Sequence, residues 1–177
     1  HRFARGYLGS RGKMQWNVIL SPDEKRYYIE QAVESLKKAN PTVSTLKRSI
    51  EFFVDEITFI EKFGFANSGD YYAAERIGRA SAFLSRENRK WIFAVYEKYI
   101  ELREAAGRLY DWDDLALYTY NELQVDDKER LYSHIIVDEG QDFSPMMIKS
   151  LVSAVDDGGS FTFFGDVAQQ IYGSRLS

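Results

Sequence analysis

Asp138 and Glu139 have the side-chain types and the position along the chain that a metal-dependent hydrolytic site needs. Both directly follow the apolar run 135–137, and a Gly-Asp pair follows a second apolar run at 161–164. A carboxylate at the end of a buried strand is rigidly placed and can hold Mg²⁺, usually through water, because this ion prefers oxygen ligands. A neighbouring carboxylate can polarise an attacking water, and Gln169 could reach a terminal phosphate. The two runs therefore predict a site for nucleotide hydrolysis.

A sheet is needed to bring the two acidic ends together. An amphipathic stretch from about 144 to 155 joins the two apolar runs and predicts a helix between two strands. A strand–helix–strand crossover of this length predicts parallel strands. Because ligands of open α/β sheets lie beyond the carboxyl ends of the strands, we expect both acidic ends on one ligand-binding edge.

A purely structural role is the alternative for each acidic residue taken alone. Asp142 and Ser144 precede Pro145, and an Asp or Ser before Pro is a good start for a helix. This alternative explains single residues, but it does not explain why two such acidic ends follow one another at this spacing. The hydrolytic interpretation therefore rests on the whole constellation.

Four segments resemble the motifs of one family. Residues 138–145, DEGQDFSP, resemble motif II of the superfamily 1 UvrD/Rep-like helicases, which reads DExQD, a hydrophobic residue, Ser or Thr, and Pro. Residues 165–173, GDVAQQIYG, resemble motif III, GDxxQxIY. Residues 110–115, YDWDDL, are similar to the DFDDL element before motif II, and residues 1–4, HRFA, to an H-x-h-A segment in which h is hydrophobic. All four occur in the family's order.

A structural interpretation of the DFDDL-like residues stays open beside the resemblance. Asp111 could cap a helix, with Asp114 in its first turn, where a carboxylate interacts favourably with the helix dipole. Both roles can hold together.

The resemblance implies an α/β fold. We expect part of a RecA-like P-loop NTPase domain with parallel strands, together with a mainly α-helical inserted subdomain. Residues 1–20 would belong to the first motor domain and lead into the insert, residues 21–109 would form the 1B-like insert, and residues 110–177 would complete the motor domain.

The implied function is that of an ATP-dependent DNA helicase or translocase that moves 3′ to 5′ on single-stranded DNA, with ATP and Mg²⁺ as cofactors. On the matching positions, Asp138 associates with Mg²⁺ through water, Glu139 is the general base, and Gln169 senses the γ-phosphate and couples it to DNA. The positions that match single-stranded DNA contacts are His1, Tyr172 and Arg175. The motifs are shared by repair helicases, recombination helicase–nucleases and fused helicases, so they do not distinguish among these.

Two positions depart from the family pattern. The family has an aromatic residue before the motif III Arg, whereas this chain has Ser174, which puts one base-stacking contact in doubt. Gly140 replaces a common Ala, and this exchange of one small residue for another is expected to have little consequence.

A phosphate loop of the form G-x-x-x-x-G-K-S/T is missing from the 177 residues. The nearest candidate fails, because Gly12-Lys13 is followed by Met14 and position 7 is Tyr. The loop supplies the backbone cradle for the phosphates, a Lys and a Mg²⁺-binding hydroxyl. We therefore expect a fragment of a longer helicase that is inactive as an ATPase alone. A non-catalytic nucleic-acid- or protein-binding module with this fold is the alternative, and an upstream phosphate loop would distinguish the two.

Composition narrows the class of protein. A hydrophobic fraction of 45% over 177 residues allows one domain or two small ones. The absence of cysteine excludes a disulfide framework and a cysteine zinc site. No apolar run approaches membrane-spanning length and no secretory signal opens the sequence, so no membrane partner and a cytoplasmic location, nucleoid-associated in a bacterium, are expected.

The net charge of −4 does not indicate nucleic-acid binding, but the amino end is locally basic and aromatic. Aromatic rings among cations suit base stacking with phosphate contacts. An extended arm whose aromatic side chains dock on the helical core explains the same composition, and both interpretations stay open. The residues concerned are Arg2, Phe3, Arg5, Tyr7, Arg11, Lys13 and Trp16.

The middle of the chain has helical periodicity. We expect helices over about 22–38, 43–62, 70–84 and 86–106, the first preceded by a Ser21–Glu24 capping box. Their aromatic residues could bind nucleic acid, but core packing is the more common role of such a stripe. The motif strands normally flank a phosphate-loop strand, so an exposed sheet edge and a tendency to dimerise or aggregate are also expected.

Overall fold

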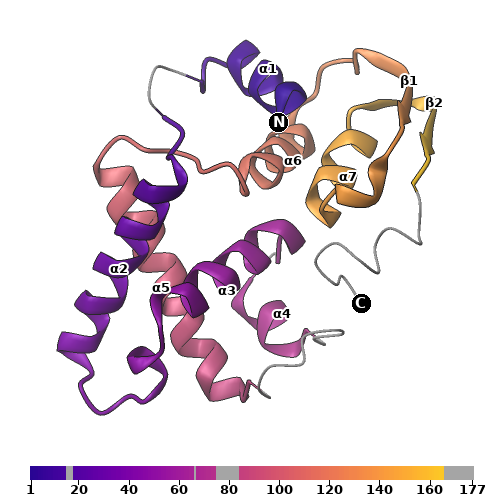
Figure 1. The fold of residues 1–177 in the computed structure, drawn as a ribbon. Coiled ribbons are helices and arrows are strands. Elements are labelled where there is room, and N and C mark those ends of the chain that lie inside the picture. Colours follow the sequence, from indigo (N-terminus) through magenta and orange to yellow (C-terminus); the bar gives the residue numbers. More distant parts are fainter. Residues whose placement is uncertain (15–17, 66, 75–83, 166–177) are drawn as a thin grey trace.

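The computed structural model describes residues 1–14, 18–65, 67–74 and 84–165, and shows a mixture of helices with a two-stranded parallel sheet (Figure 1). The elements are α1 (Arg2–Ser10), α2 (Pro22–Ala39), η1 (Thr45–Lys47), α3 (Ile50–Phe63), α4 (Ser68–Ala73), α5 (Arg86–Ala105), α6 (Leu115–Val125), β1 (Tyr132–Val137), η2 (Gly140–Asp142), α7 (Pro145–Val152) and β2 (Val155–Phe163). Among these residues, no helix has the length and apolar character needed to span a membrane.

The elements α2, η1, α3, α4 and α5 pack together and are called the helical unit (Figure 1). Their main core is apolar and includes the fully buried side chains of Ile29, Phe53, Ile57, Ile92 and Val95. Tyr71 and Tyr99 are fully buried as well, so these two aromatic residues have the core role expected of them. The side chain of Tyr27 is an exception, because 55% of it is exposed.

Short polar caps fix where the helices of this unit begin. Ser21 and Glu24 form the predicted capping box at the start of α2. The predicted helix over 43–62 is divided, because η1 is followed by an extended residue and Ser49 then caps α3. The helix expected over 70–84 begins earlier, at Ser68, and ends at Ala73, while residues 75–83 lie outside the described part.

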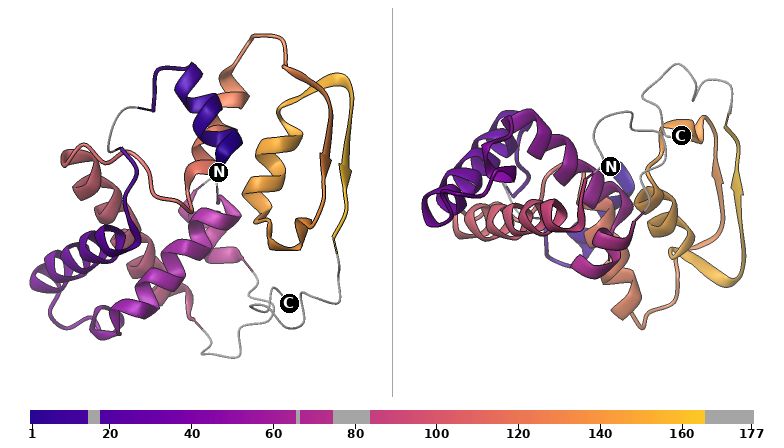
Figure 2. Two further views of the ribbon diagram at one scale, coloured as in Figure 1. Left: turned by 45° about the horizontal axis from the view of Figure 1, so that its top comes forward. Right: turned by 90° about the horizontal axis from the view of Figure 1, so that it is seen from below.

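The amino end is a helix rather than an extended arm. Ala4 and Leu8 of α1 are buried in a second, smaller core with Val18, Tyr110 and Leu115. This core lies between α1 and α6, away from the main core of the helical unit (Figures 1 and 2). The expected arm is therefore wrong in its conformation and in its docking site.

The strands β1 and β2 are parallel, as the crossover through α7 predicts. Ile135 pairs with Phe161 and Val137 with Phe163, so both strands end together at what is called the carboxyl edge. α7 lies between the sheet and α6, and covers one face of the strands (Figure 2). On β1, Val137 is buried whereas the Ile136 side chain is 70% exposed.

The strand and helix boundaries differ in part from those expected. α7 ends at Val152 rather than near 155, and β2 begins at Val155, six residues before the apolar run that predicted it. After Val155 the added strand residues, 156–160, are polar or glycine, and β2 follows β1 across a register shift between Tyr132 and His134. Hydrogen bonding to β1, rather than hydrophobic burial, therefore extends this strand.

Candidate functional site

Asp138 and Glu139 lie exposed at the carboxyl edge, directly after β1. The parallel ladder continues past both strands, because the Phe164 N–H donates to the Val137 carbonyl at 2.7 Å and the Gly140 N–H donates to the Phe164 carbonyl at 2.8 Å. These two bonds fix the backbone on either side of the carboxylates. The predicted placement of this acidic pair beside the end of the second strand is therefore confirmed.

The backbone of Glu139 adopts a left-handed conformation, with φ of 53°. Such values are uncommon for residues other than glycine. The turn lets the Glu139 N–H donate to Oδ1 of Asp138 at 2.9 Å. The carboxylate of Asp138 is consequently held against the backbone of the turn.

Gln141 holds the second carboxylate. Its Nε2 donates to Oε2 of Glu139 at 2.7 Å. A Cβ atom placed on Gly165 would lie 3.2 Å from the backbone nitrogen of Gln141, so the start of the motif III-like segment approaches the end of the motif II-like segment here. Sequence reasoning quoted Gln141 within its motif but gave it no role.

Gly140 is buried against the ring of Phe163. A Cβ atom at Gly140 would lie 2.2 Å from Cε2 of that ring. An Ala at this position would therefore require the ring to move, and the expectation that Gly and Ala are interchangeable here is wrong for this backbone.

Four sequence-predicted positions cannot be placed. Asp166, Gln169, Tyr172 and Arg175 lie outside the described residues, as does Ser174. Their roles stay predictions.

His1 contributes to a separate surface with Arg5 and Trp112, which is called the Trp112 surface. The His1 and Trp112 rings meet edge to face with 5.5 Å between centroids, and Cζ of Arg5 lies 5.9 Å from the centroid of the Trp112 ring. All three side chains are exposed, Trp112 to 38%. An aromatic ring beside cationic groups can stack on a base while a neighbouring cation contacts phosphate.

Three further basic and aromatic residues of the amino end make internal contacts. The Tyr7 hydroxyl donates to Asp126 at 2.7 Å, and Arg11 forms an ion pair with the same carboxylate. Lys13 pairs with Glu122 on α6. These side chains dock α1 and the residues after it on α6, which agrees with the interpretation of the amino end as internally packed. His1 and Arg5 are exposed and stay available for the nucleic-acid interpretation.

Trp112 was not assigned a binding role from the sequence. The sequence shows only an aromatic residue flanked by acidic residues, in a segment whose acidic residues predict a helix cap. The caps do form. Oδ1 of Asp111 accepts from the N–H groups of Asp113 and Asp114 at 2.7 and 3.1 Å, and Oδ1 of Asp114 accepts from the Asp111 N–H at 2.9 Å. α6 begins only at Leu115, so Asp111 caps the turn before the helix and Asp114 is the N-cap.

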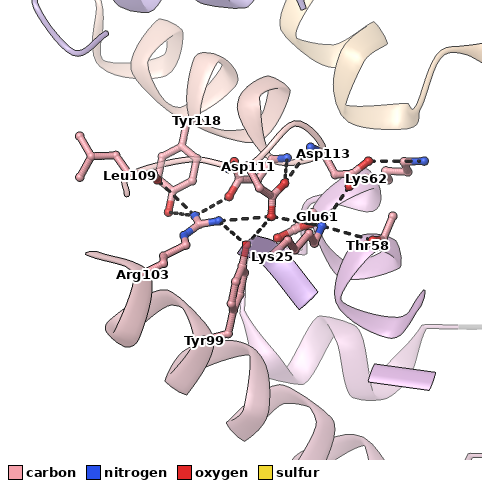
Figure 3. A network of polar contacts seen from close by, with 11 residues as sticks. Lys25, Thr58, Glu61, Lys62, Tyr99, Arg103, Leu109, Asp111, Asp113 and Tyr118 are labelled. Carbon is pink, nitrogen blue, oxygen red and sulfur yellow. Dashed lines mark hydrogen bonds and ion pairs between the residues drawn. The ribbon is translucent and has the colours of Figure 1, made fainter. Parts of the chain in front are cut away.

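The opposite oxygens of these carboxylates meet a buried arginine (Figure 3). Arg103 of α5 is fully buried and pairs with Asp111 at 3.3 Å and with Asp114. It also donates to the hydroxyl of Tyr99 at 3.0 Å and to the carbonyl of Leu109 at 3.2 Å. The planar guanidinium can serve several acceptors at once because its donors are arranged as a fixed fork.

A buried lysine occupies the other side of the same network (Figure 3). Nζ of Lys25 lies 2.6 Å from Glu61, 2.9 Å from Asp113 and 3.1 Å from Asp111. These three acidic residues have the spacing of a metal-binding group. The ammonium group of Lys25 already lies among all three carboxylates, so this cluster is an ion-pair network and we assign it no metal.

Burial and charge crowding shift the pKa values in this network. Burial raises the pKa of Glu61 well above its ordinary value, and the nearby charge of Asp111 raises it further. Burial, together with Asp111, raises the pKa of Asp114 to about 7 against the lowering effect of Arg103. Burial alone would also raise the pKa of Asp111, but Lys25 and Arg103 lower it below its usual range.

A scan of family models matches residues 18–177 to the UvrD/REP helicase N-terminal domain. The chain belongs to the UvrD/REP helicase family. Neither a search of curated proteins nor a search of solved structures gives a significant match. Membership in this family indicates an ATP-dependent helicase as the parent protein and nucleic acid as a partner.

UvrD-type helicases generally use ATP and Mg²⁺. The residues at the carboxyl edge fit that use, because Asp138 offers a hard oxygen donor at the exposed end of a fixed strand. Asp138 is exposed, and its Oδ1 accepts the N–H of Glu139, so a hydrated cation can approach the carboxylate from solvent.

Proposed function

We propose that this chain is the part of an ATP-dependent DNA helicase or translocase, moving 3′ to 5′, that activates the hydrolytic water and contacts single-stranded DNA. The observation that carries the proposal is the position of Asp138 and Glu139 at the carboxyl edge, with Gln141 fastening the carboxylate of Glu139. Rigid placement of these groups is what phosphoryl transfer requires of a protein, since catalysis depends on positioning and electrostatics.

The proposed roles follow the two carboxylates. Asp138 would hold Mg²⁺ through water, and the bound ion would supply positive charge against the phosphates. Glu139 accepts the proton of the attacking water, for which its carboxylate must stay ionised and directed by Gln141. Gln169 is proposed to report the presence of the γ-phosphate to the DNA-binding residues.

The proposed DNA contact uses the Trp112 surface. The exposed ring of Trp112 gives a stacking partner for a base, and Arg5 and His1 lie beside it. Tyr172 and Arg175 are proposed as further contacts. The net charge of −4 is a property of the whole chain, whereas Arg5 places a cation directly beside the Trp112 ring.

Steady-state ATP hydrolysis, with and without oligo(dT), tests the proposal in the longest natural polypeptide that contains these residues. Glu139→Gln is expected to lower kcat by on the order of a hundredfold or more, the usual loss when a general base is removed. Glu129→Gln, on an exposed residue before β1, is the matched control and is expected to leave kcat unchanged. Equal rates for Glu139→Gln and the unaltered protein would favour the non-catalytic binding module instead.

A further inference from the structure

Trp112 lies in a turn, and the residues immediately before and after it both form ion pairs with the helical unit. Asp111 precedes it and pairs with Arg103 of α5, and Asp113 follows it and pairs with Lys25 of α2. Asp111 also accepts the N–H of Asp113 across the Trp112 residue, at 2.7 Å. The backbone that carries the ring is thus fixed on both sides.

The contacts reach three helices of the helical unit. α3 contributes Glu61, whose Oε2 accepts from Nζ of Lys25 at 2.6 Å, and Lys62, whose Nζ lies 3.7 Å from Asp113. α5 adds Tyr99, which donates to Oδ2 of Asp111 at 2.7 Å. A displacement of any of these helices would therefore alter at least one of the polar contacts that hold the turn.

We propose that Arg103 and Lys25 are positioning residues that hold Trp112 beside His1 and Arg5, so that the helical unit controls this single-stranded DNA contact. The DNA part of this inference rests on the proposed function. Neither cation touches the Trp112 surface itself. Each acts through the carboxylates on either side of Trp112.

Ion pairs suit this role better than apolar packing would. A buried ion pair adds little net stability, because the loss of hydration offsets much of the attraction. It does fix geometry, since a charge left without its partner in the interior is strongly disfavoured. Arg103 and Asp114 are both fully buried, so intermediate positions of the turn would leave one of them unpaired. The turn is therefore expected to be either fully formed or released.

The test uses the 177-residue chain with Trp16→Phe and Trp91→Phe, which leaves Trp112 as its single tryptophan. Acrylamide quenching of Trp112 fluorescence is measured without DNA, well below the thermal midpoint found by circular dichroism. Binding of fluorescein-labelled oligo(dT) is measured by anisotropy. Arg103→Lys keeps the positive charge but removes the planar guanidinium with its several N–H donors. Arg26→Met is the control, because it removes an exposed arginine of the same helical unit.

In folded Arg103→Lys, the quenching constant of Trp112 is expected to change by about twofold or more, because a lysine cannot replace the fork. The affinity for oligo(dT) is expected to fall by about tenfold, within the range for loss of one stacked base. Arg26→Met should change neither. A purely stabilising role of Arg103 would lower the thermal midpoint but leave the quenching of the folded protein unchanged, and that result would overturn the inference.

If Arg103→Lys does not fold, Tyr99→Phe and Asp113→Asn replace it, since the first removes the hydroxyl that donates to Asp111 and the second removes the charge that pairs with Lys25 and Lys62. A changed quenching constant of Trp112 in either variant supports the inference, and unchanged quenching in both variants overturns it. Unchanged oligo(dT) binding by Trp112→Ala would instead contradict the proposed DNA contact. The two failures are distinguishable, because quenching is measured in the absence of DNA.

Discussion

Gln141 donates a hydrogen bond to Glu139 across a backbone turn, with 2.7 Å between Nε2 and Oε2. The turn itself is unusual, because Glu139 has a positive φ. An amide donor bonded to one carboxylate oxygen limits the rotation of that carboxylate. Gln141 therefore orients the proposed general base.

Replacing Gln141 by Leu should lower the kcat for ATP by about tenfold, less than the loss on removing the base itself, because the carboxylate remains but is no longer directed. Gln141→Glu should lower kcat as well, because a carboxylate cannot donate the hydrogen bond that Gln141 makes to Glu139. Gln124→Leu, which removes an exposed amide bonded to Ser153, is the control. An unchanged kcat in both Gln141 variants would exclude a direct role of this hydrogen bond in orienting the base.

Gly140 and Phe163 form a second close pair at the carboxyl edge. Gly140→Ala should destabilise the chain by about 1 kcal/mol in urea unfolding, because the added methyl group forces the ring to shift. Gly158→Ala is the matched control, since nothing lies within 4 Å of a Cβ atom there. Adding Phe163→Leu to Gly140→Ala should recover part of the loss. A full and additive loss in the double variant would show that the ring is not the obstacle.

The sequence was sufficient to predict the acidic pair at the end of a parallel strand. Apolar runs of strand length joined by an amphipathic helix leave few other arrangements, and the polar caps at Ser21 and Ser144 confirm where two helices begin. These signals are local, so they can be read without knowing the rest of the fold.

Other features depend on contacts between distant residues. α1 contains Gly6 and Gly9 and has little intrinsic preference for a helix, and its packing against α6 through Leu8 stabilises it. Arg103 and Lys25 lie on helices at positions where charged residues are normally exposed. Their buried partners explain this burial, namely Asp111 and Asp114 for Arg103 and Asp111 and Glu61 for Lys25, and no periodicity could have indicated these pairings.

The buried network should make stability depend on pH. The pKa of Glu61 is raised by burial and that of Asp114 is raised to about 7, so both contribute most to stability when protonated, below their unfolded values. This contribution is lost as pH rises through the folded pKa values. The pKa of Asp111 is lowered, so its own contribution is complete above its unfolded value and does not oppose the trend there.

Urea unfolding midpoints should therefore fall between about pH 5 and pH 8. Glu61→Gln should flatten this dependence, because the amide stays neutral at every pH and still presents an oxygen to Lys25. Glu51→Gln, at an exposed ion pair with Arg26, should leave the slope as it is. A midpoint that stays constant over the same interval would show that these carboxyl groups are ionised in both the folded and the unfolded chain.

Trp112→Ala should weaken binding of the chain to oligo(dT) by about tenfold, because one stacked base contributes roughly 1–3 kcal/mol. The salt dependence of binding should stay nearly the same, since the ring releases no counterions, whereas Arg5→Ala should reduce that dependence by about one phosphate contact. Tyr27→Ala removes a more exposed aromatic ring from α2 and is the control for non-specific aromatic effects. Affinity lost equally in Tyr27→Ala and Trp112→Ala would place the DNA elsewhere on the helical unit, and affinity kept in both would remove the Trp112 surface from the binding path.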